Sequence, residues 1–220
     1  MMHPLWVLVL SLVPGLLWVY YFYRQDPARE PIKLVLRAFF FGMLGVFPAG
    51  LLEAPFQGLF SGPSDLFSLF IFTFFIVGVV EESLKFAAAA LAVRHRQEFD
   101  QVIDGVVYLV TAALGFAAVE NYYYARAYGL AIAPARAIIA SLAHASFSGV
   151  LGYYWGLGRF TGRTPTVQGW FFAVLLHGLY DFLLLSGFIG TGGAVVGIAI
   201  LFLLLRSKVQ RAVDLAGDDK

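Results

Sequence analysis

The sequence predicts an all-α membrane protein, a polytopic bundle of about seven transmembrane helices. Of the 220 residues, 60% are hydrophobic and only 13% are charged, and the mean hydropathy is +0.79. Apolar stretches of about 20 residues, the length at which a helix spans a bilayer, recur along the chain. Lysine and arginine gather in alternate connections between these stretches. Together these three observations indicate a chain that crosses a lipid bilayer repeatedly.

Each expected span follows from the length of an apolar stretch. The first ends at Arg24 without a small-residue cleavage signal, so we expect a retained helix and not a removed signal peptide. The third is long enough that it must tilt or leave the bilayer with one end. Residues 53–64, rich in glycine and proline, predict an outer loop or a short interfacial helix. The expected spans are residues 4–23, 33–52, 66–93, 102–124, 137–157, 168–187 and 194–206.

The positions of lysine and arginine predict the orientation of the spans. Residues 1–206 are expected to form a single transmembrane domain, and residues 207–220 a short charged cytoplasmic tail. Of the 15 basic residues, 12 fall on one side and two on the other, Arg126 and Arg136, with Lys85 inside a span. Because cytoplasmic loops carry the excess of positive charge, we expect the amino terminus outside and the carboxyl terminus in the cytoplasm.

Composition also excludes several functions. The chain has no cysteine, so disulfides, thiolate metal sites and a cysteine nucleophile are ruled out. The net charge of +1 supplies no basic face for nucleic acid, so we expect no nucleic-acid partner and the lipid bilayer as the surroundings. The oligomeric state does not follow from the sequence.

Three charged residues lie in the middle of the third span, at Glu81, Glu82 and Lys85. Each charge at the centre of a membrane helix costs roughly 2.5–3.5 kcal/mol, so such residues normally face the bundle interior and mark a function. Lys85 follows Glu81 by one turn, the favourable order for an ion pair, and a purely structural pair is the alternative interpretation. Since Glu82 is rotated by roughly 100°, one carboxylate stays available for chemistry.

The fourth span carries two further ionisable residues and an amide. Asp104 lies near its start, and Phe116, Glu120 and Asn121 lie towards its outer end. Three tyrosines follow at once, so Asn121 is equally compatible with an aromatic belt at the membrane interface. For Glu120 we favour a functional role.

The fifth and sixth spans each add a histidine. His144 begins a stripe with Ser148, Gly152 and Gly156 at every fourth position, and small residues in such a stripe let a neighbouring helix approach closely. His177 and Asp181 are one turn apart and project from the same helix face. With the predicted orientation, the acids and imidazoles of four spans lie at middle to outer depth, so we expect them to meet in one chamber.

Carboxylates and imidazoles in a chamber suit the activation of water, by a general base alone or by a metal together with a base. Two imidazoles and one carboxylate match a catalytic zinc site with an open position, and we expect the set Glu120, His144 and His177 if a metal is bound. The sequence contains no His-Glu-x-x-His, no Gly-x-Gly-Asp and no Gly-x-Ser-x-Gly, which argues against three other classes of hydrolase.

The order and spacing of these residues resemble a known family. Glu81-Glu82-x-x-Lys85, Phe116-x-x-x-Glu120-Asn121, a lone His144 and His177-x-x-x-Asp181 are similar to the motif series of the PrsW family of intramembrane proteases, which belongs to a wider group with the type II CAAX prenyl proteases. Asp104-Gly105 also looks like part of the pattern, and the resemblance covers about residues 24–185.

The resemblance implies hydrolysis of peptide bonds in membrane-anchored proteins, such as anti-sigma factors, by a multi-pass protein of the prokaryotic plasma membrane. By this resemblance Glu81 would be the base that activates water, with Glu82 and Lys85 in support. Glu120 and His144 would bind or polarise the water or a metal. His177 and Asp181 would stabilise the oxyanion. The family pattern leaves open a divalent metal such as zinc and a metal-free glutamate mechanism, and the CAAX relatives have His where this chain has Glu120.

Two other function classes compete with a protease. One is a non-catalytic membrane scaffold or binding protein, because a subunit of gamma-secretase resembles this wider group without being its catalyst. The other is a proton-coupled transporter, because chains of acids and histidines also relay protons. The intact Glu81-Glu82 pair argues against a degenerate site.

Overall fold

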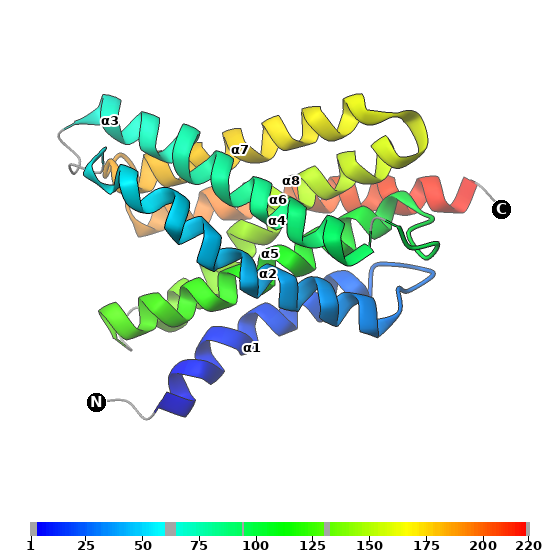
Figure 1. The fold of residues 1–220 in the computed structure, drawn as a ribbon, viewed down its shortest axis with the longest axis horizontal. Helices are drawn as coiled ribbons and strands as arrows, with labels where there is room; N and C mark the ends of the chain where they lie inside the picture. The colour runs from blue at the N-terminus through cyan, green and yellow to red at the C-terminus, as the bar shows by residue number, and fades with distance from the viewer. Residues whose placement is uncertain (1–3, 60–64, 94, 130–132, 219–220) are drawn as a thin grey trace.

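The computed structural model describes residues 4–59, 65–93, 95–129 and 133–218, and within them it is helical without strands. Figure 1 shows the helices running side by side along the long axis of the molecule. In chain order they are α1 (Pro4–Tyr23), α2 (Ile32–Glu53), the 3₁₀ helix η1 (Ala54–Leu59), α3 (Leu66–Phe70), the π-helix η2 (Ile71–Gly78), α4 (Val79–Val93), α5 (Val102–Tyr128), α6 (Ala133–Thr161), α7 (Arg163–Leu185) and α8 (Thr191–Asp218).

The described residues contain seven segments long and apolar enough to cross a membrane, which confirms the expected all-α membrane bundle. The short helix expected after the second span is present as η1, although residues 60–64 lie outside the described residues. α6 begins four residues earlier than expected, at Ala133, and α8 continues past residue 206 to Asp218. The division of the chain at residue 206 therefore stays a prediction.

The two ends of the described chain lie at opposite ends of the bundle, as an odd number of spans requires (Figure 1). Which of these ends faces the cytoplasm stays the prediction made from lysine and arginine.

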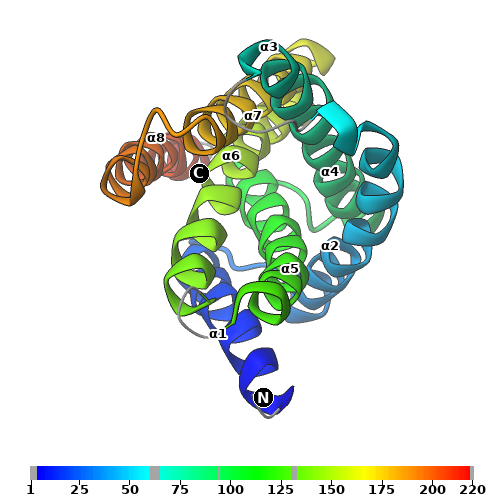
Figure 2. The same ribbon diagram turned by 90° about the vertical axis from the view of Figure 1, so that its left-hand side faces the viewer.

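The bundle is organised around α5. In the apolar windows of α5 and α6, 94% and 78% of the residues are buried inside the protein, against 22–39% in the other spans. Figure 2 shows α1, α2, α4 and α6 arranged around α5, with α7 and α8 packed beyond α6. The outer helices present large apolar side chains outward, including Leu17 and Leu51, and hydrocarbon is the solvent that such a surface requires.

Small residues bring α5 and α6 into backbone contact. A Cβ atom added to Gly152 would lie 2.5 Å from the carbonyl oxygen of Gly105, and one added to Gly156 would collide with the backbone of Val102. The predicted close approach along the stripe that contains His144 is thus confirmed. Because the two backbones touch, side chains of α5 and α6 further along the same seam reach one another.

The third span has the expected bounds, residues 66–93, but it is not α-helical throughout. Residues Ile71–Gly78 form the π-helix η2, directly before the charged residues of α4. A π-helix has wider turns than an α-helix and is frequent next to functional sites. On its neighbour α7, Gly178 lies against Phe74 so closely that a Cβ atom would be 2.8 Å from the Cα of Phe74. The π-helix ends three residues before Glu81, so the wider turns lie directly next to the charged residues.

Candidate active site

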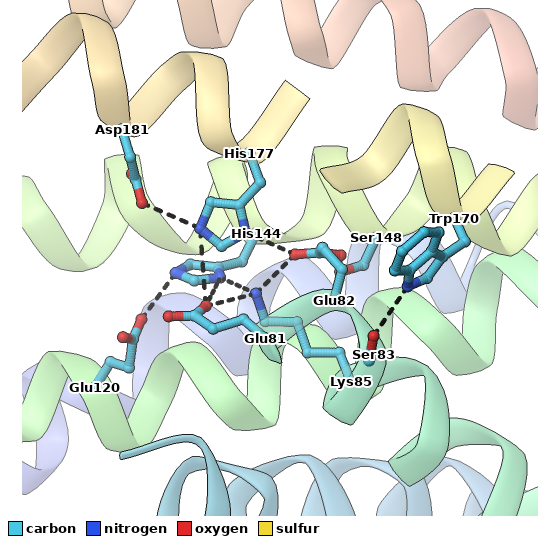
Figure 3. Close-up of polar contacts among 10 residues, drawn as sticks. All are labelled: Glu81, Glu82, Ser83, Lys85, Glu120, His144, Ser148, Trp170, His177 and Asp181. Carbon is cyan, nitrogen blue, oxygen red and sulfur yellow. Dashed lines mark hydrogen bonds and ion pairs between the residues drawn. The ribbon is translucent and has the colours of Figure 1, made fainter. Parts of the chain in front are cut away.

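A cavity of about 330 Å³ opens among the helices at the side chains that the sequence singled out. It lies between α2, α4, α5, α6 and α7, and Figure 3 shows the polar side chains of α4, α5, α6 and α7 pointing toward one another. Its volume falls at the small end of ligand-binding sites. The polar and ionisable residues that line it are Glu53, Glu81, Glu120, Tyr124, Arg136, His144, His177, Tyr180 and Asp181.

Lys85 occupies the centre of the polar network. Its Nζ lies 2.9 Å from Oε2 of Glu81, 2.8 Å from Oε1 of Glu82 and 2.8 Å from Nδ1 of His144. The ammonium also sits 4.7 Å from the ring centroid of Phe116, a cation–π distance. The one-turn pair of Glu81 with Lys85 is confirmed, but the lysine side chain is fully buried and serves both carboxylates and an imidazole.

The two neighbouring glutamates have different surroundings. Glu82 is fully buried: Ser148 donates to its Oε2 at 2.7 Å, and its Oε1 lies 2.9 Å from Nδ1 of His177 as well as close to Lys85. Glu81 instead lines the cavity. The geometry therefore leaves Glu81 as the carboxylate that meets a molecule in the cavity, with Glu82 fixed behind it.

His177 is held between carboxylates. Its Nδ1 contacts Glu82, and its Nε2 lies 3.3 Å from Oδ2 of Asp181 and 3.8 Å from Oε2 of Glu81. Its ring stacks on Phe147, with 4.9 Å between centroids and 19° between planes. The expected shared face of His177 and Asp181 is present, and two carboxylates and an aromatic ring fix the orientation of this imidazole.

His144 and Glu120 meet across the seam between α6 and α5. Nε2 of His144 lies 2.9 Å from Oε2 of Glu120, while the lysine ammonium donates to Nδ1. This places the hydrogen of the neutral imidazole on Nε2, facing the acid. One donor atom each from Glu81, Glu120 and His144 lie within 4.8 Å of one another, a grouping compatible with a metal ion. His177, expected as a ligand, is not in this group because its ring nitrogens face Glu82 and Asp181.

Phe116 and Asn121, the residues expected to support Glu120, differ in their positions relative to the cavity. Phe116 lies under the Lys85 ammonium, with its ring 6.1 Å from that of His144. Asn121 is turned away from the cavity, and its amide nitrogen donates to Ser141 at 3.1 Å while its Oδ1 is buried without a hydrogen-bond partner. Asn121 thus links α5 to α6 and does not line the cavity.

Asp104 lies at the other end of α5, far along the helix from Glu120. Its Oδ2 accepts from the backbone nitrogens of Asp100 and Gln101, at 2.9 and 2.6 Å, which caps the start of α5. Its side-chain neighbours are Asp26 and Glu30 from the connection between α1 and α2. In this connection, burial raises the pKa of Glu30 to about 9 and also raises the pKa of Asp26.

The structure adds cavity residues that the sequence did not single out. Glu53, at the end of α2, has a buried Oε1 without a hydrogen-bond partner, and it was assigned to a loop because it directly follows an apolar span. The sequence indicates Arg136 only as a basic loop residue. In the structure its guanidinium stacks 3.3 Å from the ring centroid of Tyr124, and its buried Nε has no hydrogen-bond partner. Ser148 does not line the cavity but donates to Glu82, and the sequence indicates it only as one of the small residues of a stripe. For Glu53 and Arg136, the only signal in the sequence is that each is a charged residue at the end of an apolar span.

Comparison with known proteins gives one consistent result. The model of the PrsW family of intramembrane metalloproteases matches residues 30–205. Protease PrsW of Geobacillus kaustophilus is 35% identical over 80% of this chain and 78% of its own length, and Protease PrsW of Bacillus subtilis is 34% identical over 79% and 80%. Protease PrsW of Shouchella clausii is 31% identical over 92% of this chain and 94% of its own. No solved structure matches the chain.

Proposed function

Because the chain belongs to the PrsW family of intramembrane metalloproteases, we propose that the cavity around Glu81 is its catalytic centre. The protein is an intramembrane protease, a multi-pass protein of the prokaryotic cell membrane, and its substrate is a membrane-embedded protein. One observation supports the assignment of the centre: acids and imidazoles from α4, α5, α6 and α7 line the same cavity between these helices. Membership of a protease family sets aside the scaffold and transporter alternatives.

Glu81 is the proposed general base. A water molecule in the cavity gives a proton to the Glu81 carboxylate while its oxygen attacks the carbonyl carbon of the substrate peptide bond. When the C–N bond breaks, the same proton passes to the leaving nitrogen, so the products are a carboxyl group and an amine. Glu82 is unsuited to this role because its oxygens already accept from Ser148, Lys85 and His177.

His177 is proposed to stabilise the negative charge that develops on the carbonyl oxygen. With Glu82 at Nδ1, the ring is oriented so that Nε2 faces the cavity near Asp181 and Glu81. A donor fixed in this way before the reaction stabilises an oxyanion without the cost of reorientation. Asp181 accepts the Nε2 hydrogen until the oxygen of a substrate carbonyl takes the place of the Asp181 carboxylate as acceptor.

A metal ion fits the cavity at Glu81, Glu120 and His144. Two carboxylate oxygens and one imidazole nitrogen are ligands that zinc accepts, and three protein ligands leave a position for water. A bound zinc would lower the pKa of that water and polarise the substrate carbonyl. His144 would bind the ion through Nε2 only after the hydrogen leaves that nitrogen for Nδ1, so Lys85, which donates to Nδ1, would have to move away or give up a proton.

The substrate class that we propose is a protein with a single membrane span, cleaved for regulation as in the cleavage of an anti-sigma factor. This assignment rests on the family resemblance. A polar centre between membrane-spanning helices supports it, since a substrate that also spans the membrane can bring a peptide bond to that centre.

The test measures cleavage and metal content in the same preparations. Full-length protein with Glu81→Gln, His144→Ala or His177→Ala is reconstituted with single-span reporter substrates, and products are identified by mass spectrometry. We expect cleavage to fall by at least 100-fold in each variant, the lower range for loss of a general base or an oxyanion donor. Asp214→Asn, which neutralises an exposed carboxylate on α8, is the matched control with unchanged activity.

Elemental analysis of these samples tests the metal. A stoichiometric metal in the wild type that is lost in His144→Ala and Glu120→Gln supports the proposed ligands. Full activity in metal-free protein supports the glutamate mechanism and rules out the metal requirement. Wild-type activity in all three variants of the cavity would refute the proposed centre.

A further inference from the structure

A second cluster of ionisable side chains lies at the end of α5 remote from the catalytic cavity. It consists of Asp26 and Glu30, from the connection between α1 and α2, and Asp104 in the first turn of α5. All three are buried, with exposures of 2%, 4% and 2%. One carboxylate oxygen of each lies within 4.8 Å of the others. Three acids from two separate segments of the chain are thus packed against one another away from water.

Among the described residues, this cluster contains no balancing cation. The ion pairs of Lys85, His144 and His177 lie at the catalytic cavity, and Arg29, which acts on Asp26 from a distance, is exposed. Buried carboxylates are normally paired or bound to a metal, because leaving a charge unpaired in a protein interior costs several kcal/mol. Within the described part of the chain, carboxylates of this cluster that stay ionised therefore have no cation beside them.

The hydrogen bonds of the cluster leave one acceptor unused. Oδ1 of Asp26 accepts from the backbone nitrogen of Ala28 at 2.8 Å, Oδ2 of Asp104 accepts from two backbone nitrogens, and Tyr108 donates to Oε2 of Glu30. Oδ2 of Asp26 is buried and accepts no hydrogen bond. A proton shared between Glu30 and Asp104 would satisfy those two acids but would leave this oxygen without a partner. An unfilled anionic oxygen inside an acidic cluster is where an ion is expected.

We propose that Asp26, Glu30 and Asp104 form a binding site for a hard divalent cation, separate from the catalytic centre. The three side chains offer oxygen donors only, a set that favours Mg²⁺, Ca²⁺ or Mn²⁺ over zinc. The bound ion ties the connection between α1 and α2 to the first turn of α5. Since α5 also carries Glu120 at its opposite end, the ion fixes the position of the helix on which the catalytic cavity depends.

Binding is tested on the full-length protein in detergent after removal of metals with a chelator. Thermal unfolding is followed by tryptophan fluorescence while Mg²⁺, Ca²⁺, Mn²⁺ or Zn²⁺ is added. We expect one of the first three to raise the unfolding midpoint by several degrees in the wild type and in Glu120→Gln, but not in Asp26→Asn or Glu30→Gln. Glu98→Gln removes an exposed carboxylate from the neighbouring connection and should respond like the wild type.

Terbium supplies a second measurement that does not depend on the acidic variants folding. Tb³⁺ replaces Ca²⁺ in oxygen sites and emits when excited through a nearby tyrosine, and Tyr108 contacts the site through Glu30. Emission that is quenched by the stabilising cation and reduced by Tyr108→Phe supports the proposal. The proposal is overturned if no cation raises the unfolding midpoint and terbium gives no such emission. It is also overturned if the stabilisation by a cation persists in Asp26→Asn. A stabilisation that disappears only in Glu120→Gln would place the cation at the catalytic centre and overturn the proposal as well.

Discussion

Replacing Lys85 by methionine tests how the charged centre is held in the bundle. The change keeps much of the side-chain length but removes the ammonium that lies 2.9 Å from Glu81, 2.8 Å from Glu82 and 2.8 Å from His144. Removing one partner of a buried ion pair costs about 3–5 kcal/mol, because the remaining charge is left buried without compensation. Here two carboxylates lose the same cation, so we expect a loss of unfolding free energy at the upper end of that range.

The measurement is reversible unfolding in mixed detergent micelles, followed by tryptophan fluorescence. Lys33→Met, which removes an exposed lysine near the start of α2, is the matched control and should change the free energy of unfolding by less than about 0.5 kcal/mol. Adding Glu82→Gln to Lys85→Met should recover part of the loss, because one uncompensated charge disappears. A loss below about 1 kcal/mol, or a double variant no more stable than the single one, would refute the view that Lys85 compensates the buried carboxylates.

Three further changes separate support from catalysis. Ser148→Ala should cost about 1–3 kcal/mol in unfolding free energy and lower the cleavage rate without abolishing it; complete loss with intact folding would assign the hydroxyl a direct catalytic role. Glu53→Gln should raise the unfolding midpoint, since its carboxylate shares the cavity with three other acids and its Oε1 has no partner; a lower midpoint would contradict this. Gly152→Ala should cost about 1–3 kcal/mol and reduce cleavage, because the added Cβ would lie 2.5 Å from the oxygen of Gly105, whereas Gly50→Ala, with open space around it, should do neither.

The contacts that the sequence predicted are mainly those within one helix. The spacing of Glu81 and Lys85, and of His177 and Asp181, is fixed by the helical repeat, and both pairs are in contact, at 2.9 and 3.3 Å. The spans themselves follow from hydropathy, because lipid selects apolar stretches of a defined length. These predictions needed no knowledge of how the helices pack.

Contacts between helices depend on rotation and register, which one sequence does not determine. The third span has the bounds that hydropathy predicts, but hydropathy does not show that residues Ile71–Gly78 form the π-helix η2 directly before α4. Asp104 was grouped with the catalytic motifs by its neighbours in the sequence, but the length of α5 separates it from Glu120 and places it beside Asp26. Glu53 directly follows the apolar span of α2, so the sequence gives no reason to distinguish it from a loop residue. The packing of the helices places it at the cavity.

The division of labour between the two adjacent glutamates depends on the packing of α4 against α6 and α7. A rotation of roughly 100° between consecutive residues directs Glu82 toward Ser148 and His177, and Glu81 into the cavity. The same carboxylate chemistry is thereby used in two ways, one acid fixing an imidazole and the other left open to a reacting molecule. An exchange of these roles would require α4 to rotate by that angle, which would also withdraw Lys85 from His144. The positions of α4, α6 and α7 thus determine which glutamate meets the substrate.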